Sequence, residues 1–67
     1  MYEYIKSKLQ QAGEVMIKST EGQMFELHLH NTSFDDARRM IEIDAGTEVY
    51  WINGEEIAYA WIHKEVK

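Results

Sequence analysis

The sequence predicts a small α+β domain in the order α-β-β-α-β-β, with an antiparallel sheet of two hairpins and helices packed on it. Three observations lead to this prediction. Apolar residues with helical spacing open the chain, alternating apolar residues flank a glycine turn after it, and two β-rich runs flank an Asn-Gly pair near the end. A single domain over residues 1–67 is expected, because a chain this short buries only about 60% of its unfolded surface.

The first element is expected to be a helix over residues 2–12. Tyr2, Ile5, Leu9 and Ala12 recur three or four positions apart and therefore share one helical face. Gly13 supplies the left-handed residue that ends a helix. A helix of this length is marginal alone, so it must dock on the rest of the chain.

A hairpin is expected next, and the length of its turn decides which side chains share a face. A two-residue turn at Glu21-Gly22 would place Ile17 beside Glu26, whereas a three-residue loop over residues 20–22 groups the apolar side chains. We predict the three-residue loop, with Gly22 at positive φ. The core face then holds Val15, Ile17, Phe25, Leu27 and Leu29. The opposite face holds Met16, Lys18, Met24, Glu26, His28 and His30.

Residues 34–45 are predicted to form a second helix. Ser33 and Asp36 match a capping pattern, and Gly46 can end the helix. The expected buried stripe consists of Phe34, Ala37, Met40, Ile41 and Ala45. The alternative is a fifth strand over residues 39–44, where isoleucines alternate with charged residues.

The last third is predicted to be a hairpin around Asn53-Gly54, the preferred pair for a tight β-turn. Neither face of this hairpin is polar, although a solvated antiparallel sheet usually has one polar face. One face carries Val49, Trp51, Ala58, Ala60 and Ile62, whose two alanines suit close packing of a helix. The other face is aromatic and also carries His63.

The aromatic face is the predicted contact surface. Either a helix covers each face, or the aromatic face is buried by a second copy of the chain or by a partner, as aromatic residues at interfaces often are. We favour the second interpretation and expect a homodimer. The predicted interface residues are Tyr50, Ile52, Ile57, Tyr59 and Trp61.

A metal site is the alternative function. Glu26, His28 and His30 share a strand face at successive positions about 7 Å apart, and His63 could add a third nitrogen. His-x-His alone is a weak motif, and half-exposed strand residues would give the same pattern.

Catalytic motifs are absent from the sequence. It contains no cysteine and no G-x-S-x-G elbow, and its glycines are scattered. Ser33 lies near His30 and Asp35, but helix capping accounts for that serine. We therefore expect no enzymatic activity and no cofactor.

The charge balance favours a protein partner. Twelve acidic and seven basic residues give a net charge of −5, so nucleic acid is not expected as a ligand, whereas a basic protein fits this field. Arg38 and Arg39 are the only adjacent cations and are expected on a solvated helix face. No apolar run approaches the length of a membrane span, and the opening residues lack a signal peptide's apolar segment, so a cytoplasmic location is expected.

The overall pattern over residues 14–64 resembles that of many small acidic proteins from bacteria and phages, some of which inhibit host enzymes or defence complexes. That resemblance and the composition together predict a small acidic, non-enzymatic interaction or regulatory module.

Overall fold

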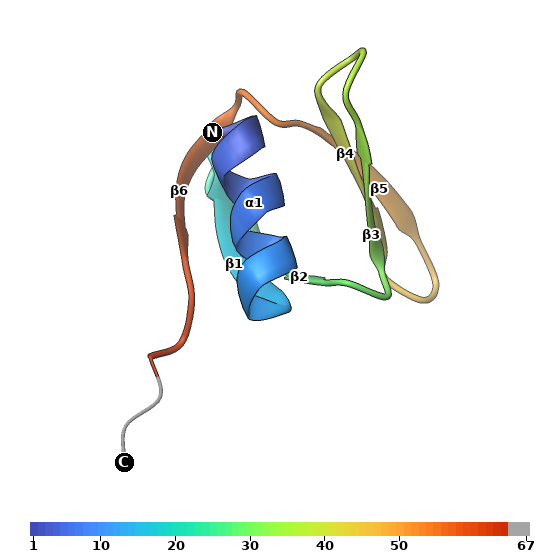
Figure 1. The fold of residues 1–67 in the computed structure, drawn as a ribbon. Helices are drawn as coiled ribbons and strands as arrows, with labels where there is room; N and C mark the ends of the chain where they lie inside the picture. Colours follow the sequence, from blue (N-terminus) through green and yellow to red (C-terminus); the bar gives the residue numbers. More distant parts are fainter. Residues whose placement is uncertain (65–67) are drawn as a thin grey trace.

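The computed structural model describes residues 1–64, which form one helix and six strands in two antiparallel sheets. The elements are α1 (Tyr2–Ala12), β1 (Glu14–Ser19), β2 (Met24–His28), β3 (Thr32–Asp35), β4 (Met40–Asp44), β5 (Val49–Asn53) and β6 (Ile57–Trp61). Sheet A has the strand order β2-β1-β6, and sheet B has the order β3-β4-β5. The two sheets lie on either side of α1 in Figure 1. The predicted α+β class is confirmed, with one helix where two were expected.

The helix α1 forms where the apolar spacing predicts it. Tyr2, Ile5 and Leu9 are buried, while Ala12 is exposed. Gly13 takes the left-handed conformation at φ 79°, and its backbone N–H donates to the Leu9 carbonyl at 2.8 Å. At 11 residues, this helix is too short, and not apolar enough, to cross a membrane.

The β1–β2 hairpin has the predicted register. Val15 pairs with Leu27, and Ile17 pairs with Phe25. The Ser19 N–H donates to the Gln23 carbonyl at 2.8 Å and so closes the three-residue loop over residues 20–22. Gly22 in this loop has a positive φ of 90°. Choosing the register by the grouping of apolar side chains therefore gives the correct pairing.

Leu29, which was predicted to lie on the core face, is 59% exposed. Strand β2 ends at His28, because the Asn31 side chain accepts the His28 backbone N–H at 2.8 Å and the chain turns there. The Asn31 N–H donates back to the His28 carbonyl at 3.2 Å. A local side-chain bond of this kind ends a strand that hydrophobic alternation alone would extend.

The predicted helix over residues 34–45 is wrong, and the alternative strand over residues 39–44 is confirmed by β4. Strands β3 and β4 form a hairpin in which Phe34 pairs with Ile41. Ile41 and Ile43 are both buried, which is the two-residue period of a strand. The Asp35 carboxylate accepts the Arg38 backbone N–H at 3.2 Å, so this residue of the expected first helical turn stabilises a β-turn instead.

The predicted hairpin at Asn53-Gly54 is also wrong. Strand β5 pairs with β4 and strand β6 pairs with β1, so this turn carries the chain from sheet B to sheet A. Figure 1 shows the chain crossing from β5 to β6, which lie in different sheets. Gly54 is required here by space rather than by turn type, since a Cβ atom would lie 2.5 Å from Cδ1 of Tyr2.

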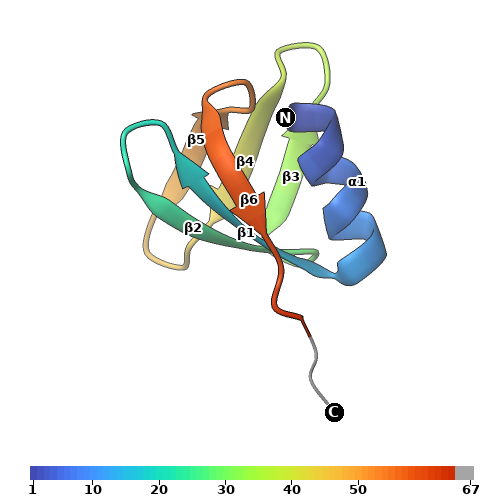
Figure 2. The ribbon, with the colours of Figure 1, turned by 90° about the vertical axis from the view of Figure 1, so that its left-hand side faces the viewer.

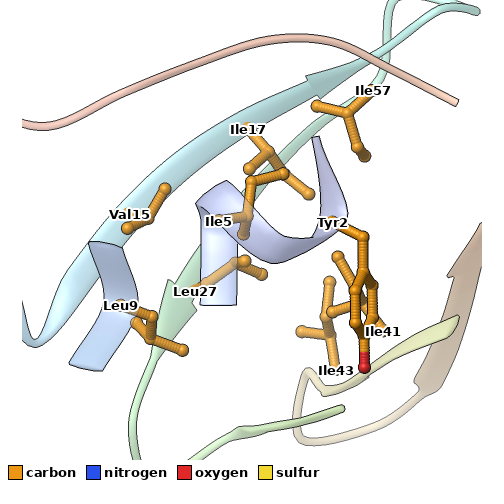
Figure 3. Packing of buried hydrophobic residues seen from close by; sticks show 9 residues of the cluster. All are labelled: Tyr2, Ile5, Leu9, Val15, Ile17, Leu27, Ile41, Ile43 and Ile57. Carbon is orange, nitrogen blue, oxygen red and sulfur yellow. The ribbon is translucent and has the colours of Figure 1, made fainter. Parts of the chain in front are cut away.

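The core lies where α1 meets the inner faces of both sheets (Figure 3). In Figure 2 the strands of sheet A lie in front of sheet B, and α1 lies at one side of both. The buried cluster consists of Tyr2, Ile5, Leu9, Val15, Ile17, Leu27, Ile41, Ile43 and Ile57. Phe34, Met40 and Ala45 do not join it as a helical stripe; Phe34 packs against its edge.

A β-bulge between β1 and β6 decides which side chains of β6 reach this core. Lys18 pairs with Tyr59, but its neighbour Ser19 pairs with Ile57. The extra residue on β6 shifts the alternation, so that Ile57 is buried and Tyr59 is on the outer side.

Candidate interaction surfaces

The five predicted interface residues do not form one surface. Ile57 is buried at 6% exposure, and Tyr50 and Ile52 pack against the core from β5. The Tyr50 ring meets the Phe25 ring edge-on at 5.3 Å. Only Tyr59 and Trp61, both on β6, lie on the outer side of a sheet.

Tyr59 and Trp61 form an aromatic pair on the outer face of sheet A. Their ring centroids lie 5.4 Å apart, and Tyr59 is 49% exposed. The Lys18 ammonium lies 5.9 Å from the Tyr59 ring centroid, a distance compatible with a cation–π contact. Met16 pairs with Trp61 across the strands. In Figure 2, no helix covers this face of β6.

A shallow groove runs between α1 and β6, next to the aromatic pair. Its volume is about 170 Å³, and its lining is mainly apolar. Tyr4 and Ile62 at its rim are exposed, and the Lys8 ammonium lies 5.6 Å from the Tyr4 ring. The lining residues are Tyr4, Ile5, Lys8, Val15, Ala60, Trp61 and Ile62.

Trp51 is exposed, although the sequence predicted that a helix would cover it. Its face of β5 was expected to pack under a helix, but α1 lies on the inner side and Trp51 is 64% exposed. The indole Nε1 donates to the Glu42 carboxylate at 2.8 Å across the β4–β5 ladder. Reading β4 as a strand would have placed these two side chains on one outer face.

The metal-site prediction involves Glu26, His28 and His30, which do lie close together. The His28 Nε2 atom is 3.1 Å from Glu26, and the two imidazole rings stack at 5.5 Å. His63 lies instead 3.9 Å from Glu14. Within residues 1–64, no group of three side chains is arranged to hold a metal ion.

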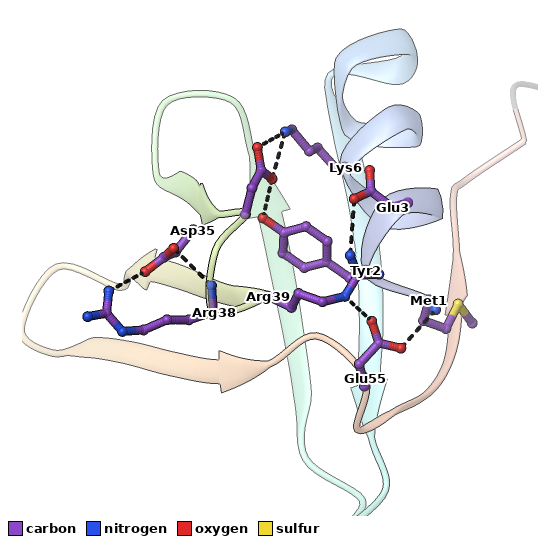
Figure 4. A network of polar contacts seen from close by, with 9 residues as sticks. Met1, Tyr2, Glu3, Lys6, Asp35, Arg38, Arg39 and Glu55 are labelled. Carbon is purple, nitrogen blue, oxygen red and sulfur yellow. Dashed lines mark hydrogen bonds and ion pairs between the residues drawn. The ribbon is translucent and has the colours of Figure 1, made fainter.

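A polar network joins the start of α1 to the β3–β4 loop (Figure 4). The Tyr2 hydroxyl donates to Asp36 at 2.6 Å, and the Lys6 ammonium donates to the same carboxylate at 2.8 Å. These two bonds lower the pKa of Asp36. Burial, and then the bond to Asp36, raise the pKa of Tyr2. The network therefore fixes the helix against sheet B.

Arg39 extends this network to the turn between β5 and β6. Its guanidinium donates to Glu55 at 2.7 Å and to Glu3 at 3.3 Å, and lies 4.9 Å from the Tyr2 ring. The bond from Arg39 lowers the pKa of Glu55. Instead of lying on a solvated helix face, Arg39 takes a left-handed conformation in a loop, at φ 55°.

Comparisons with models of known protein families, with curated proteins and with solved structures give no match.

Proposed function

We propose that this protein is a non-enzymatic interaction module that self-associates as a homodimer through strand β6. The observation that carries this proposal is the free edge of β6, which bears the exposed Tyr59 and the half-buried Trp61 and borders the apolar groove. Strand β1 is the one strand within residues 1–64 that pairs with β6. An open edge presents unpaired backbone N–H and C=O groups, which favour the addition of another strand.

The free edge of β5 is less accessible than that of β6. A hollow of about 240 Å³ separates it from the β1–β2 loop, and residues of both segments line that hollow. Phe25 on β2 also packs against Tyr50 on β5. The β1–β2 hairpin therefore partly covers β5, whereas the groove leaves room beside β6.

A second copy of the chain fits β6 because antiparallel pairing of one strand with itself obeys two-fold symmetry. Such an interface is closed, since residue i of one copy meets residue j of the other while residue j of the first meets residue i of the second. The apolar groove of each copy would border the paired strands, because Ala60 and Trp61 of β6 line it. The added apolar burial would also supplement the small core of a 67-residue chain.

The charge distribution around β6 permits two acidic copies to approach. Each chain carries a net charge of −5, but no charged residue lies within Ile57–Trp61. Lys8 lines the groove, and Lys18 lies over Tyr59. The contact surface is therefore less acidic than the protein as a whole, which limits electrostatic repulsion at the interface.

Light scattering at micromolar concentrations tests the proposal. We expect a mass close to twice the 7.9 kDa of the single chain. Trp61→Ala should raise the dimer dissociation constant by roughly tenfold or more, as expected for a tryptophan that becomes buried in an interface.

The matched control is Trp51→Ala, which removes the same side chain from the outer face of sheet B. This variant should stay dimeric. A monomeric wild-type protein, or equal loss of dimer in both variants, would contradict assembly through β6.

A further inference from the structure

A second surface, on the outer face of sheet B, has a different chemical character from β6. It contains a hollow of about 410 Å³ beside the exposed Trp51 indole. Strands β3, β4 and β5 all contribute to its lining, and α1 does not. The lining residues are Ser33, Phe34, Asp35, Arg38, Met40, Glu42 and Trp51.

The hydrogen bond from Trp51 to Glu42 fixes the orientation of the indole. One carboxylate oxygen of Glu42 accepts the indole N–H at 2.8 Å. That bond uses the edge of the indole, so the ring face stays free for stacking. The second Glu42 oxygen can still accept hydrogen bonds from a ligand.

Of the two carboxylates that line the hollow, Asp35 has a cationic partner and Glu42 has none among the described residues. Asp35 is paired with the Arg38 guanidinium at 3.1 Å, which lowers the pKa of Asp35. Glu42 forms no ion pair with any residue of the described part of the chain. The exposed indole therefore lies beside an uncompensated negative charge, within a protein whose net charge is −5.

We propose that this hollow binds an arginine side chain of a basic protein partner. The guanidinium stacks on the Trp51 ring and donates to Glu42. An aromatic face beside a carboxylate attracts a cation through both the ring quadrupole and the ion pair. Arginine fits better than lysine because its planar, weakly hydrated guanidinium stacks on the indole while its N–H groups pair with the carboxylate.

This site is independent of the proposed dimer. It uses β4 and β5, whereas the dimer uses β6 and the groove beside α1. A protein that fails to dimerise can still bind the arginine ligand. A protein that fails to bind arginine can still dimerise.

The probe for this site is the peptide acetyl-Gly-Arg-Gly-amide. Its matched control contains citrulline, which has nearly the same shape as arginine but no charge. Titration followed by the ¹H–¹⁵N signals of the two indoles should shift the Trp51 signal with the arginine peptide and leave the Trp61 signal in place. Equal shifts with the citrulline peptide, or no Trp51 shift at millimolar peptide, would overturn the proposal.

Variants separate the charge of Glu42 from its structural role. Glu42→Gln keeps an oxygen for the indole N–H but removes the charge, and should weaken arginine-peptide binding roughly fivefold or more. Glu26→Gln, on the outer face of sheet A, should leave binding unchanged. Arg38→Gln should strengthen binding, because it removes a like charge and frees Asp35. Equal affinity of Glu42→Gln and wild type would refute the site.

Discussion

The contact between Gly54 and Tyr2 shows how a single position joins three parts of the molecule. A Cβ atom at residue 54 would lie 2.5 Å from Cδ1 of Tyr2 and 3.0 Å from the Arg39 carbonyl oxygen. Gly54 also donates its N–H to that carbonyl at 2.8 Å. Tyr2 is fully buried and cannot move aside without disturbing the core.

Gly54→Ala should therefore lower the free energy of unfolding by about 1–3 kcal/mol, the usual cost of overpacking. Urea denaturation measures this loss. A double-mutant cycle with Tyr2→Ala checks its origin, because removing the ring removes the nearest clashing atom. An identical cost in both backgrounds would show that the contact with the ring is not the cause.

At the scale of elements, the sequence was informative where pairing is local. The hairpin from residue 14 to residue 28 could be predicted, because only one loop length groups its apolar side chains and Gly22 allows that loop. The segment around β3 and β4 could not be predicted, since Ser33 and Asp36 also match a helix-capping pattern. Ile43 was the residue that distinguished the two structures, because it is buried in β4 but lay outside the predicted helical stripe.

Substitutions in β4 test this strand directly. Ile43→Ala should destabilise the protein by about 2–4 kcal/mol, as expected for a buried isoleucine. Met40→Ala should cost less, because Met40 is only partly buried. Thermal or urea unfolding of the two variants measures the difference. A greater loss for Met40→Ala would favour the helical stripe that the sequence suggested.

Long-range pairing is the part of the fold that sequence could not give. Asn53-Gly54 indicates a turn, but a turn does not determine whether the strands beside it pair with each other. Strand β6 pairs with β1, and a bulge at Ser19 then reverses the expected orientation of Ile57 relative to Tyr59. The predicted interface therefore grouped Tyr59 and Trp61, whose rings lie 5.4 Å apart, with residues that pack in or against the core.

At the scale of the whole molecule, the two proposed contacts should respond to salt in opposite directions. Two chains of net charge −5 repel each other, so screening should strengthen the dimer. Binding of the arginine peptide is an attraction between opposite charges, so screening should weaken it. Light scattering and the indole titration at low and high sodium chloride measure both effects. Weaker dimerisation at high salt would indicate that ion pairs hold the two copies together.

The pairing of β6 with β1 also constrains the order in which the chain can fold. Residues near the start and the end of the described chain meet in this pair, since Met16 lies opposite Trp61. The contacts within α1 and the β1–β2 hairpin are local and can form first, before β6 closes over their apolar side chains. Ile57 joins the core only when β6 arrives. Pairing of strands so distant in the sequence slows folding, so a partly folded chain exposes its apolar surface to other molecules until β6 docks.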